Sequence, residues 1–283
     1  IFNSIDNAVP KNAGAFRRIK LHLKDNGVVG IPRHPTSCSA ATTNLADRVQ
    51  NSTMRAMAEI GEGLGMGEIG CFCPPSTSVV SGTDPRNNKA YVNQLFLGHT
   101  AGAGAPKEDA WMTMLHAGNG GMCFIDSVEL DEIYTPIHVQ TRRLIADSEG
   151  AGRFRGAPGI EVELRPVSCR MEAGFVADGN IHNPLGARGG DAAAKSDQFR
   201  RTRRGDLERL DQCSQVWIED GEALVSIACG GGGYGDPKTR DPIRVLNDVR
   251  EGLISRSRAQ NVYGVVVTET MEIDETATAA LKN

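Results

Sequence analysis

Glycine limits the fold of this chain more than any other feature of its sequence. There are 33 glycines in 283 residues, and four of them, Gly230–Gly233, follow one another directly. Glycine has no Cβ, so another backbone can approach it closely, but it adds no apolar side chain to a core. The composition therefore predicts many turns and close backbone contacts, in a body rich in strands and loops.

The glycine run raises the question of a phosphate cradle. The pattern G-x-G-x-x-G occurs twice, at Gly65, Gly67 and Gly70 and at Gly230, Gly232 and Gly235. A dinucleotide fingerprint needs a strand before it and a helix directly after it. A predicted helix precedes the first copy, and Asp236 and Pro237 separate the second copy from its helix. Neither copy has the Gly-Lys-Ser/Thr of a P-loop. We expect a tightly packed backbone turn here, and we assign no cofactor-binding residues.

Periodicity in the first part of the chain predicts one strand, one helix and many loops. The alternation in "FRRIKLHL" (16–23) is typical of a half-buried strand. Apolar residues recur at helical spacing from 40 to 60, with Ser37 or Ser39 available as the N-cap. Residues 61–110 are rich in Gly, Pro, Ser and Asn, which predicts loops and short strands.

The middle of the chain is predicted to be largely extended. We expect extended structure over 128–144, a short alternating strand over 159–167, and a long polar excursion over 172–209. The stretch "QVWIEDGEALVSIAC" (215–229) predicts two strands joined in a hairpin at Asp220-Gly221.

The C-terminal end is predicted to be helical. Asp241 can cap a helix that has Pro242 in its first turn, Ser255 can begin a second short helix, and "YGVVV" (263–267) resembles a final strand. The fold class is therefore mixed α/β (α+β), strand-rich, with largely antiparallel sheets, long Gly-rich loops and a helical C-terminal tail.

Charge and cysteine content exclude several classes of function. The net charge of −4 gives no broad basic field, so we expect no nucleic acid partner. A single basic cluster, Arg200, Arg201, Arg203 and Arg204, is typical of a solvated loop and, less often, of a site for phosphate or an acidic partner. No apolar run approaches the ~20 residues of a membrane span, so we expect no membrane partner.

The seven cysteines are odd in number and scattered, which favours a reducing, cytoplasmic setting over a disulfide framework. Cys71 and Cys73 lack the second pair that a structural zinc site needs. Semi-buried thiols in a loop are the alternative interpretation of this pair.

The densest group of chemistry-bearing side chains lies between residues 98 and 138. We select five candidate catalytic residues there: His99, Asp109, His116, Asp126 and His138. Carboxylates and imidazoles can act as acid and base or bind a metal, and glycine-rich loops let them converge. Their spacing matches no short metal signature, so the metal ligands are unknown and a structural role stays open for each residue.

Several longer strings resemble one family. "NAGAFRRIKL", "ADSEGAGRFRGAPGIEVEL", "GGGGYGDPKTRDPIRVLNDVREGLIS" and "VYGVVV" resemble the hydantoinase B (N-methylhydantoinase B, oxoprolinase-type) family, in the family's order and over nearly the whole chain. The resemblance implies a hydantoinase A-type partner that binds ATP and phosphorylates the substrate, and a B-type chain that supports the opening of a cyclic amide. Related acetone and acetophenone carboxylases instead carboxylate an activated enol.

The resemblance also implies that an essential part lies outside this chain. Family members are usually twice as long, and this sequence corresponds to the C-terminal half. The metal-ligand Asp and His residues of lactam-cleaving members lie in the N-terminal half. We therefore expect a divalent metal (Zn, Mn or Mg) in the complex, held mainly by a chain carrying that half, and ATP on the A-type subunit. Residues 1–170, with the candidate substrate-cavity loops, and 171–283, with the hairpin and helices, are expected to form one compact unit.

Two differences from the family pattern leave the reaction open. Hydrolase members usually carry Asn-Thr-Pro followed closely by glutamate, where this chain has Tyr134-Thr135-Pro136-Ile137-His138. The string "HTAGAGAPKED" (99–109) is closer to the ketone carboxylases. We expect His99, Asp109 and His116 to line a substrate cavity, with Asp126 and His138 as acid/base or supporting groups. The leading expectation is a hydrolase subunit acting on a small cyclic amide; the alternatives are a ketone carboxylase subunit and a non-catalytic structural subunit.

Overall fold

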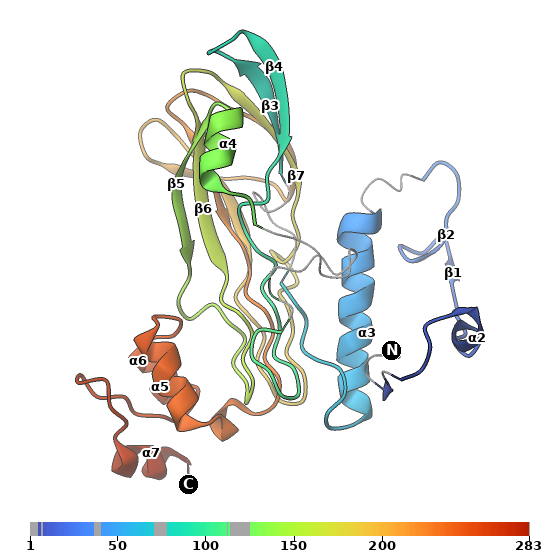
Figure 1. The fold of residues 1–283 in the computed structure, drawn as a ribbon, viewed down its shortest axis with the longest axis vertical. Coiled ribbons are helices and arrows are strands. Elements are labelled where there is room, and N and C mark those ends of the chain that lie inside the picture. Colours follow the sequence, from blue (N-terminus) through green and yellow to red (C-terminus); the bar gives the residue numbers. More distant parts are fainter. Residues whose placement is uncertain are drawn as a thin grey trace.

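Two antiparallel sheets form the body of the molecule (Figure 1). The computed structural model describes residues 5–6, 8–36, 41–70, 78–111, 113 and 125–282. The first sheet has the strand order β10-β7-β3-β4. Its strands are β3 (Val79–Asp84), β4 (Lys89–Gln94), β7 (Met171–Val176) and β10 (Cys213–Ile218). The second sheet has the order β5-β6-β11-β8-β9. Its strands are β5 (Ile137–Leu144), β6 (Ile160–Pro166), β8 (Asp197–Arg201), β9 (Leu207–Arg209) and β11 (Ala223–Ile227).

One apolar core joins the two sheets. It combines Val80, Met171 and Ile218 of the first sheet with Leu164 and Leu224 of the second, and all five side chains are almost completely buried. Removing this apolar surface from water is the main force that holds the sheets together. The strand predicted over 159–167 is confirmed as β6, whereas the excursion predicted over 172–209 is wrong in part, because it contains β8, β9 and most of β7.

The predicted hairpin over 215–229 is wrong, although both of its strands exist. β10 pairs with β7, while β11 pairs with β6 and β8 in the other sheet. The turn at Gly221, which has a φ of 86°, carries the chain from one sheet to the other. The sequence shows the turn, but strand partners are chosen by the packing of both sheets on the shared core.

Below the sheets, five segments outside the named strands pack backbone against backbone. We call them the glycine bundle: residues 66–70, 101–105, 148–157, 184–194 and 228–235, seen in Figure 1 as long loops that run together. The last segment is central. Gly231 bonds to segment 148–157, Gly232 to segments 66–70 and 101–105, and Gly233 to segment 184–194.

The bundle explains the glycine run. A Cβ on Gly231 would lie 2.0 Å from the carbonyl oxygen of Gly102, and one on Gly233 would lie 1.9 Å from that of Ala151. The N–H groups of Gly231, Gly232 and Gly233 donate to carbonyls of other segments. These amides are already used, so they are not available to a phosphate, and the expectation of tight backbone packing is confirmed.

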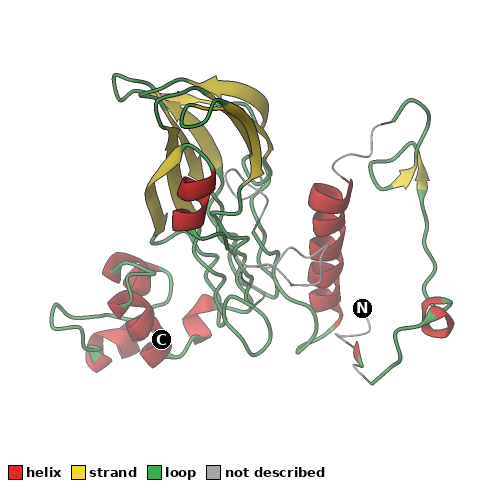
Figure 2. Cartoon of the chain, turned by 45° about the horizontal axis from the view of Figure 1, so that its top comes forward, coloured by secondary structure: helices red, strands yellow, loops and turns green. Residues whose placement is uncertain are grey.

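Helices flank this body, as Figure 2 shows. α3 (Ala46–Ile60) follows a π-helical turn, η1 (Ala41–Leu45), and confirms the helix predicted over 40–60; the proposed caps Ser37 and Ser39 lie outside the described residues. α4 (Val128–Tyr134) contradicts the extended structure predicted at the start of 128–144. The Ser127 hydroxyl accepts a hydrogen bond from the Leu130 N–H, and acidic residues in the first turn favour this helix.

The C-terminal helices pack as a separate layer, and the predicted helical tail is confirmed. A short η3 (Pro237–Thr239) leads to α5 (Pro242–Arg250), α6 (Arg256–Asn261) and α7 (Glu275–Lys282). The Asp241 carboxylate caps α5 and the Ser255 hydroxyl caps α6, as the sequence predicted. The final strand predicted over 263–267 is wrong: in this stretch only Val267 forms a bridge, with Ile273, because Tyr263, Val265 and Val267 pack into the cluster of the C-terminal helices instead.

The N-terminal segment 8–36 lies apart from the body, beyond α3 (Figure 1). It contains α2 (Ala13–Phe16), capped by Asn12, and the short parallel pair β1 (Lys24–Asp25) and β2 (Gly30–Ile31). The half-buried strand predicted over 16–23 is wrong. Residues 17–23 pair with no strand of the described chain, so their apolar side has no sheet to bury against.

These elements together make the predicted mixed α/β fold with antiparallel sheets. Within the described ranges, no helix has the length and apolar character needed to cross a bilayer.

Candidate functional site

A group of polar side chains gathers where β5 and α4 meet the loop that leads into the glycine bundle. We call it the inner polar cluster: Asn93, His99, Asp126, Asp131 and Arg142. The Arg142 charge favours a lower pKa for both His99 and Asp131, and the Asp126 charge favours a higher pKa for Asp131. The cluster therefore brings together two of the predicted candidates, His99 and Asp126, with three residues that were not predicted.

Arg142 reaches the cluster because β5 contains a bulge. The pairing of β5 with β6 shifts register between Val139 and Thr141. After this shift, Arg142 lies opposite Val162, a residue of the apolar core. Side chains directly opposite in antiparallel strands share a face, so Arg142 points to the inner side of the sheet. Its guanidinium donates to the Asp126 carbonyl oxygen over 3.5 Å.

His99 is buried, and its tautomer follows from its hydrogen bond. Nε2 lies 2.9 Å from the Pro158 carbonyl oxygen, which can only accept, so Nε2 carries the proton and Nδ1 keeps its lone pair. Burial lowers the pKa of His99, the hydrogen bond to Pro158 raises it, and the Arg142 charge lowers it again, with a net decrease. His99 is therefore a neutral imidazole at pH 7 whose Nδ1 can accept a proton.

The two aspartates differ in their environment. The Asp126 carboxylate accepts a hydrogen bond from the Phe96 N–H at 2.5 Å. Asp131 is 8% exposed; its Oδ1 accepts from Asn93 at 3.1 Å, and its buried Oδ2 has no hydrogen-bond partner among the described residues. Burial and the nearby Asp126 charge raise the pKa of Asp131. Asp131 is therefore a carboxyl group that takes a proton more easily than a free aspartate does.

Asp109 lies in a different cluster, which ties the bundle to the C-terminal helices. Its carboxylate accepts two hydrogen bonds from Arg240, at 2.7 and 2.9 Å, and one from the Arg155 N–H at 2.9 Å. Arg240 also pairs with Asp248 of α5 at 2.8 Å, and so does Arg155. Although burial raises the pKa of Asp109, the hydrogen bonds and charges of these arginines lower it overall. This geometry is that of a structural ion-pair network.

His138, another predicted candidate, does not join the inner polar cluster. His138 lies on β5, where Nδ1 is 3.0 Å from Glu132 Oε1, and its side chain is 47% exposed. The same Glu132 oxygen accepts from the Val139 N–H at 2.8 Å, which fixes this pair at the surface. His116 lies outside the described residues.

Sequence reasoning missed Asp131 and Arg142 for different reasons. Asp131 is one of several acidic residues between 98 and 138, but the pattern around it predicts extended structure, so nothing indicates that it is buried. Arg142 lies beyond that stretch, and only the bulge turns it inward. No pattern in the sequence marks a bulge at this position, because Gln140 is neither glycine nor proline.

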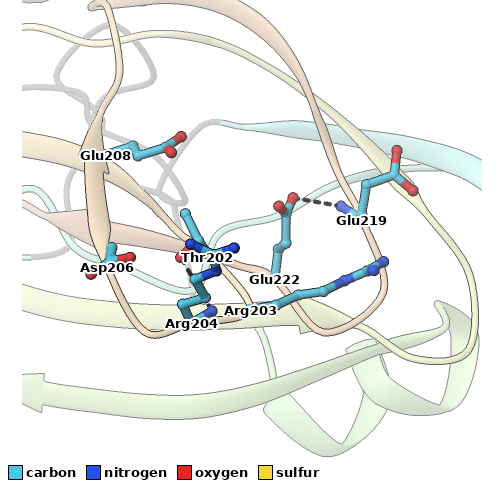
Figure 3. A pocket seen from close by; sticks show the side chains of 7 residues that line it. All are labelled: Thr202, Arg203, Arg204, Asp206, Glu208, Glu219 and Glu222. Atoms are coloured by element: carbon cyan, nitrogen blue, oxygen red, sulfur yellow. Dashed lines mark hydrogen bonds between the residues drawn. The ribbon is translucent and has the colours of Figure 1, made fainter.

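The basic cluster at 200–204 is largely bonded within the chain. Arg200 pairs with Glu208 at 2.5 Å, Arg201 with Glu163 at 2.8 Å, and Arg203 donates to the Asp220 carbonyl oxygen at 2.8 Å. Figure 3 shows the adjoining surface hollow of about 420 Å³. Its walls carry the side chains Thr202, Arg203, Arg204, Asp206, Glu208, Glu219 and Glu222. Mixed charge around an open hollow fits the solvated-loop interpretation better than a phosphate site.

The described residues do not form a metal centre. Within those residues, no three His, Cys, Asp or Glu side chains are close enough together to hold an ion. Cys71, Cys73 and Cys38 lie outside the described ranges. Because the donor set does not fit a metal, no step of the chemistry is assigned to one on these residues.

Comparison with known proteins agrees with the resemblance seen in the sequence. The model of the family described as hydantoinase B/oxoprolinase matches residues 1–237. The chain belongs to this family. Among curated relatives, the beta subunit of the caprolactamase of Pseudomonas jessenii is 31% identical over 96% of this chain and 47% of its own length. The B-type subunit of a putative D-/L-hydantoinase of Pseudomonas sp. (strain NS671) is 27% identical over 96% of this chain and 45% of its own.

Solved structures support the same fold for this hydantoinase B family member. The ATP-dependent caprolactamase from Pseudomonas jessenii matches with a TM-score of 0.79 and 25% identity, over 99% of this chain and 49% of that one. The acetone carboxylation enzyme in its nucleotide-free structure matches with a TM-score of 0.63 at 20% identity, which supports the fold alone. The chain spans about half the length of the relatives it matches.

Proposed function

We propose that this chain forms the B-type part of an ATP-dependent enzyme that opens a cyclic amide, and that an A-type partner binds the ATP. The observation that carries the proposal is the likeness, over nearly all of the chain, to the beta subunit of a caprolactamase whose solved structure is described as ATP-dependent. The chain matches only about half of that protein, so we expect the activity to need the remaining half as well.

The reaction would begin with transfer of a phosphoryl group from ATP to the carbonyl oxygen of the cyclic amide on the partner. This makes the carbonyl carbon more electrophilic. Water then adds to that carbon, its proton passes to a base, the C–N bond breaks, and the ring nitrogen takes a proton. A second water later releases phosphate from the acyl phosphate that remains.

The inner polar cluster offers groups suited to the hydrolytic steps. The His99 Nδ1 lone pair can accept the proton of the attacking water, and the buried Nε2–H bond to Pro158 keeps this tautomer in place. Arg142 supplies a positive charge of the kind that stabilises an anionic, phosphorylated substrate. Asp131, whose pKa is raised, can hold a proton for the ring nitrogen.

The test is ATP-dependent turnover of the assembly that contains this chain, its remaining half and the A-type partner. His99→Gln keeps a side-chain N–H for the Pro158 carbonyl but removes the base. We expect the rate of ring opening, measured by mass spectrometry of the product, to fall on the order of 10²-fold or more. The assembly should stay intact. Full turnover by this variant would exclude the proposed role of His99 and favour a structural, non-catalytic role for the chain.

Carboxylation of a ketone is the second candidate. The acetone carboxylase alpha subunit of Xanthobacter autotrophicus is 27% identical over 55% of this chain, and the acetophenone carboxylase delta subunit of Aromatoleum aromaticum is 26% identical over 98%. Incorporation of labelled bicarbonate into a ketone by the same assembly, without ring opening of caprolactam or hydantoin, would establish this alternative and exclude the first.

A further inference from the structure

The N-terminal segment 8–36, which we call the arm, exposes its apolar side chains instead of burying them. No residue of the arm is buried. The exposed fraction is 78% for Leu21 and 87% for Val28. Four more large apolar residues of the arm are exposed: Phe16, Leu23, Val29 and Ile31. Single exposed apolar residues are normal on a protein surface, but this density along one segment marks a contact surface.

The hydrogen bonds described for the arm are local. The hydrogen bonds described for it join residues of the first 36 to one another, such as the Asn12 cap of α2 and the Arg33–Asp25 pair. Figures 1 and 2 both place the arm on the side of α3 that faces away from the sheets. α3 itself leaves Val49 and Ile60 exposed, at 40% and 69%. The arm and α3 therefore both expose apolar side chains on this side of the molecule.

The charge of the arm narrows the kind of surface that can cover it. Its Lys and Arg residues outnumber its Asp and Glu residues, whereas the whole chain has a net charge of −4. Asp25, the acidic residue of the arm, is already paired with Arg33. A complementary surface would be apolar at its centre and carry carboxylates around its edge.

We propose that the arm, together with the outward side of α3, is the surface that binds the remaining half of the hydantoinase B family polypeptide. This rests on the assembly in the proposed function but not on its reaction. The solved caprolactamase chain matches 99% of this chain, arm included, while more than half of that chain lies outside the match. A family partner of that size is thus available to cover the arm, whether it is part of the same polypeptide or a separate chain.

The experiment is limited tryptic digestion of the assembled protein, meaning this chain with the remaining half. Arg17, Arg18 and Lys24 supply cleavage sites in the arm, and the exposed Arg204 supplies an internal reference site. We expect the arm sites to be cut at least tenfold more slowly than Arg204. The double variant Leu21→Asp/Val28→Asp places charges in the contact, so arm cleavage should become at least tenfold faster.

Val92→Asp is the matched control, because Val92 is 74% exposed on β4, away from the arm, and should leave arm protection unchanged. The midpoint of thermal unfolding of the body should be the same in all variants, since no residue of the arm belongs to the core between the sheets or to the cluster of the C-terminal helices. Arm cleavage as fast as that at Arg204 in the assembled protein would overturn the proposal. Protection in this chain alone, with native mass spectrometry showing a dimer, would also overturn it in favour of a second copy. If the arm is protected from trypsin in an assembly that does not open the cyclic amide, the result would support the arm as the binding surface. It would count against the proposed reaction only.

Discussion

Arg240 connects three parts of the fold through one guanidinium. Its side chain is 1% exposed, and it bonds to Asp109, Asp248 and the Arg153 carbonyl oxygen. Asp109 leads out of the glycine bundle and Asp248 lies in α5, so Arg240 fixes the C-terminal helices to the body. A buried ion pair adds little net stability, but breaking it leaves an unpaired charge in the interior.

Arg240→Ala should therefore destabilise the chain severely. The free energy of unfolding, measured by urea titration, should fall by about 3–5 kcal/mol, because Asp248 and Asp109 each lose the most deeply buried of their arginine partners. Arg244→Ala is the matched control. Arg244 also contacts Asp109, at 3.3 Å, but its side chain is 46% exposed, so the loss should stay below about 1 kcal/mol. Equal losses in the two variants would contradict this account of Arg240.

His99 should make stability depend on pH on the acidic side of neutrality. Its folded pKa is lowered from 6.5, so below that pH the unfolded state binds the proton more readily than the folded state. Stability then falls as the pH drops from 6.5 towards the folded pKa. The difference in unfolding free energy between pH 7.5 and 5.5 should be smaller in His99→Gln than in the parent. An unchanged difference would show that His99 does not contribute.

The sequence indicates which side chains are of types that can act in catalysis, but not which partners each of them has in the fold. His99 and Asp109 come from one glycine-rich stretch, yet the structure places them with different partners. The reason is the path of the backbone through the bundle, where residues ten apart in sequence meet different segments. Asp131 and Arg142 depend on a helix cap and a bulge, which are local features that side-chain types alone do not predict.

At the scale of elements, the glycine bundle replaces side-chain packing by backbone contact. Its glycines are needed because neighbouring carbonyls occupy the space of a Cβ, and most of them do not need the left-handed conformation. This distinguishes most of them from Gly221, in the turn between the sheets, and from Gly235, at the end of the bundle, whose φ values are 86° and 75°. The run in the sequence predicted close packing, but it could not show that four other segments surround it.

Gly231→Ala should disrupt the bundle. The added methyl would meet the Gly102 carbonyl oxygen at 2.0 Å, so backbone must move, at a cost of about 3 kcal/mol or more. Gly174→Ala on β7 is the control, because the nearest atom to its Cβ lies 4.0 Å away and its φ is not positive. Its unfolding free energy should change by less than about 1 kcal/mol. If chemical denaturation gave similar losses for both, close backbone contact would not explain the run.

On the scale of the whole molecule, the strand order crosses the boundary that the sequence placed at residue 170. β7 pairs with β3, and β11 pairs with β6, so each sheet draws strands from both sides of that boundary. The sequence predicted helices α3, α5 and α6 well, because caps and periodicity are local. It predicted strand partners poorly, because pairing between β10 and β7 depends on a core built from distant segments.

We predict that the body, residues 41–282, unfolds in one cooperative transition. Among the described residues, the shared core joins the two sheets, and the Arg240 network joins α5 to the loops below them. Far-ultraviolet circular dichroism and tryptophan fluorescence should give coincident urea transitions. Two resolved transitions, one for the sheets and one for α5–α7, would show instead that the C-terminal helices form a unit of their own.

The central position of segment 228–235 also sets an order of events during synthesis. The four segments around it leave the ribosome earlier, yet amides such as those of Gly104 and Gly150 find their acceptors only on Gly232 and Gly231. Closing contacts over so many residues is slow. Most of the chain is therefore synthesised before the centre of the bundle exists. The bundle can form only after residues 228–235 have been translated.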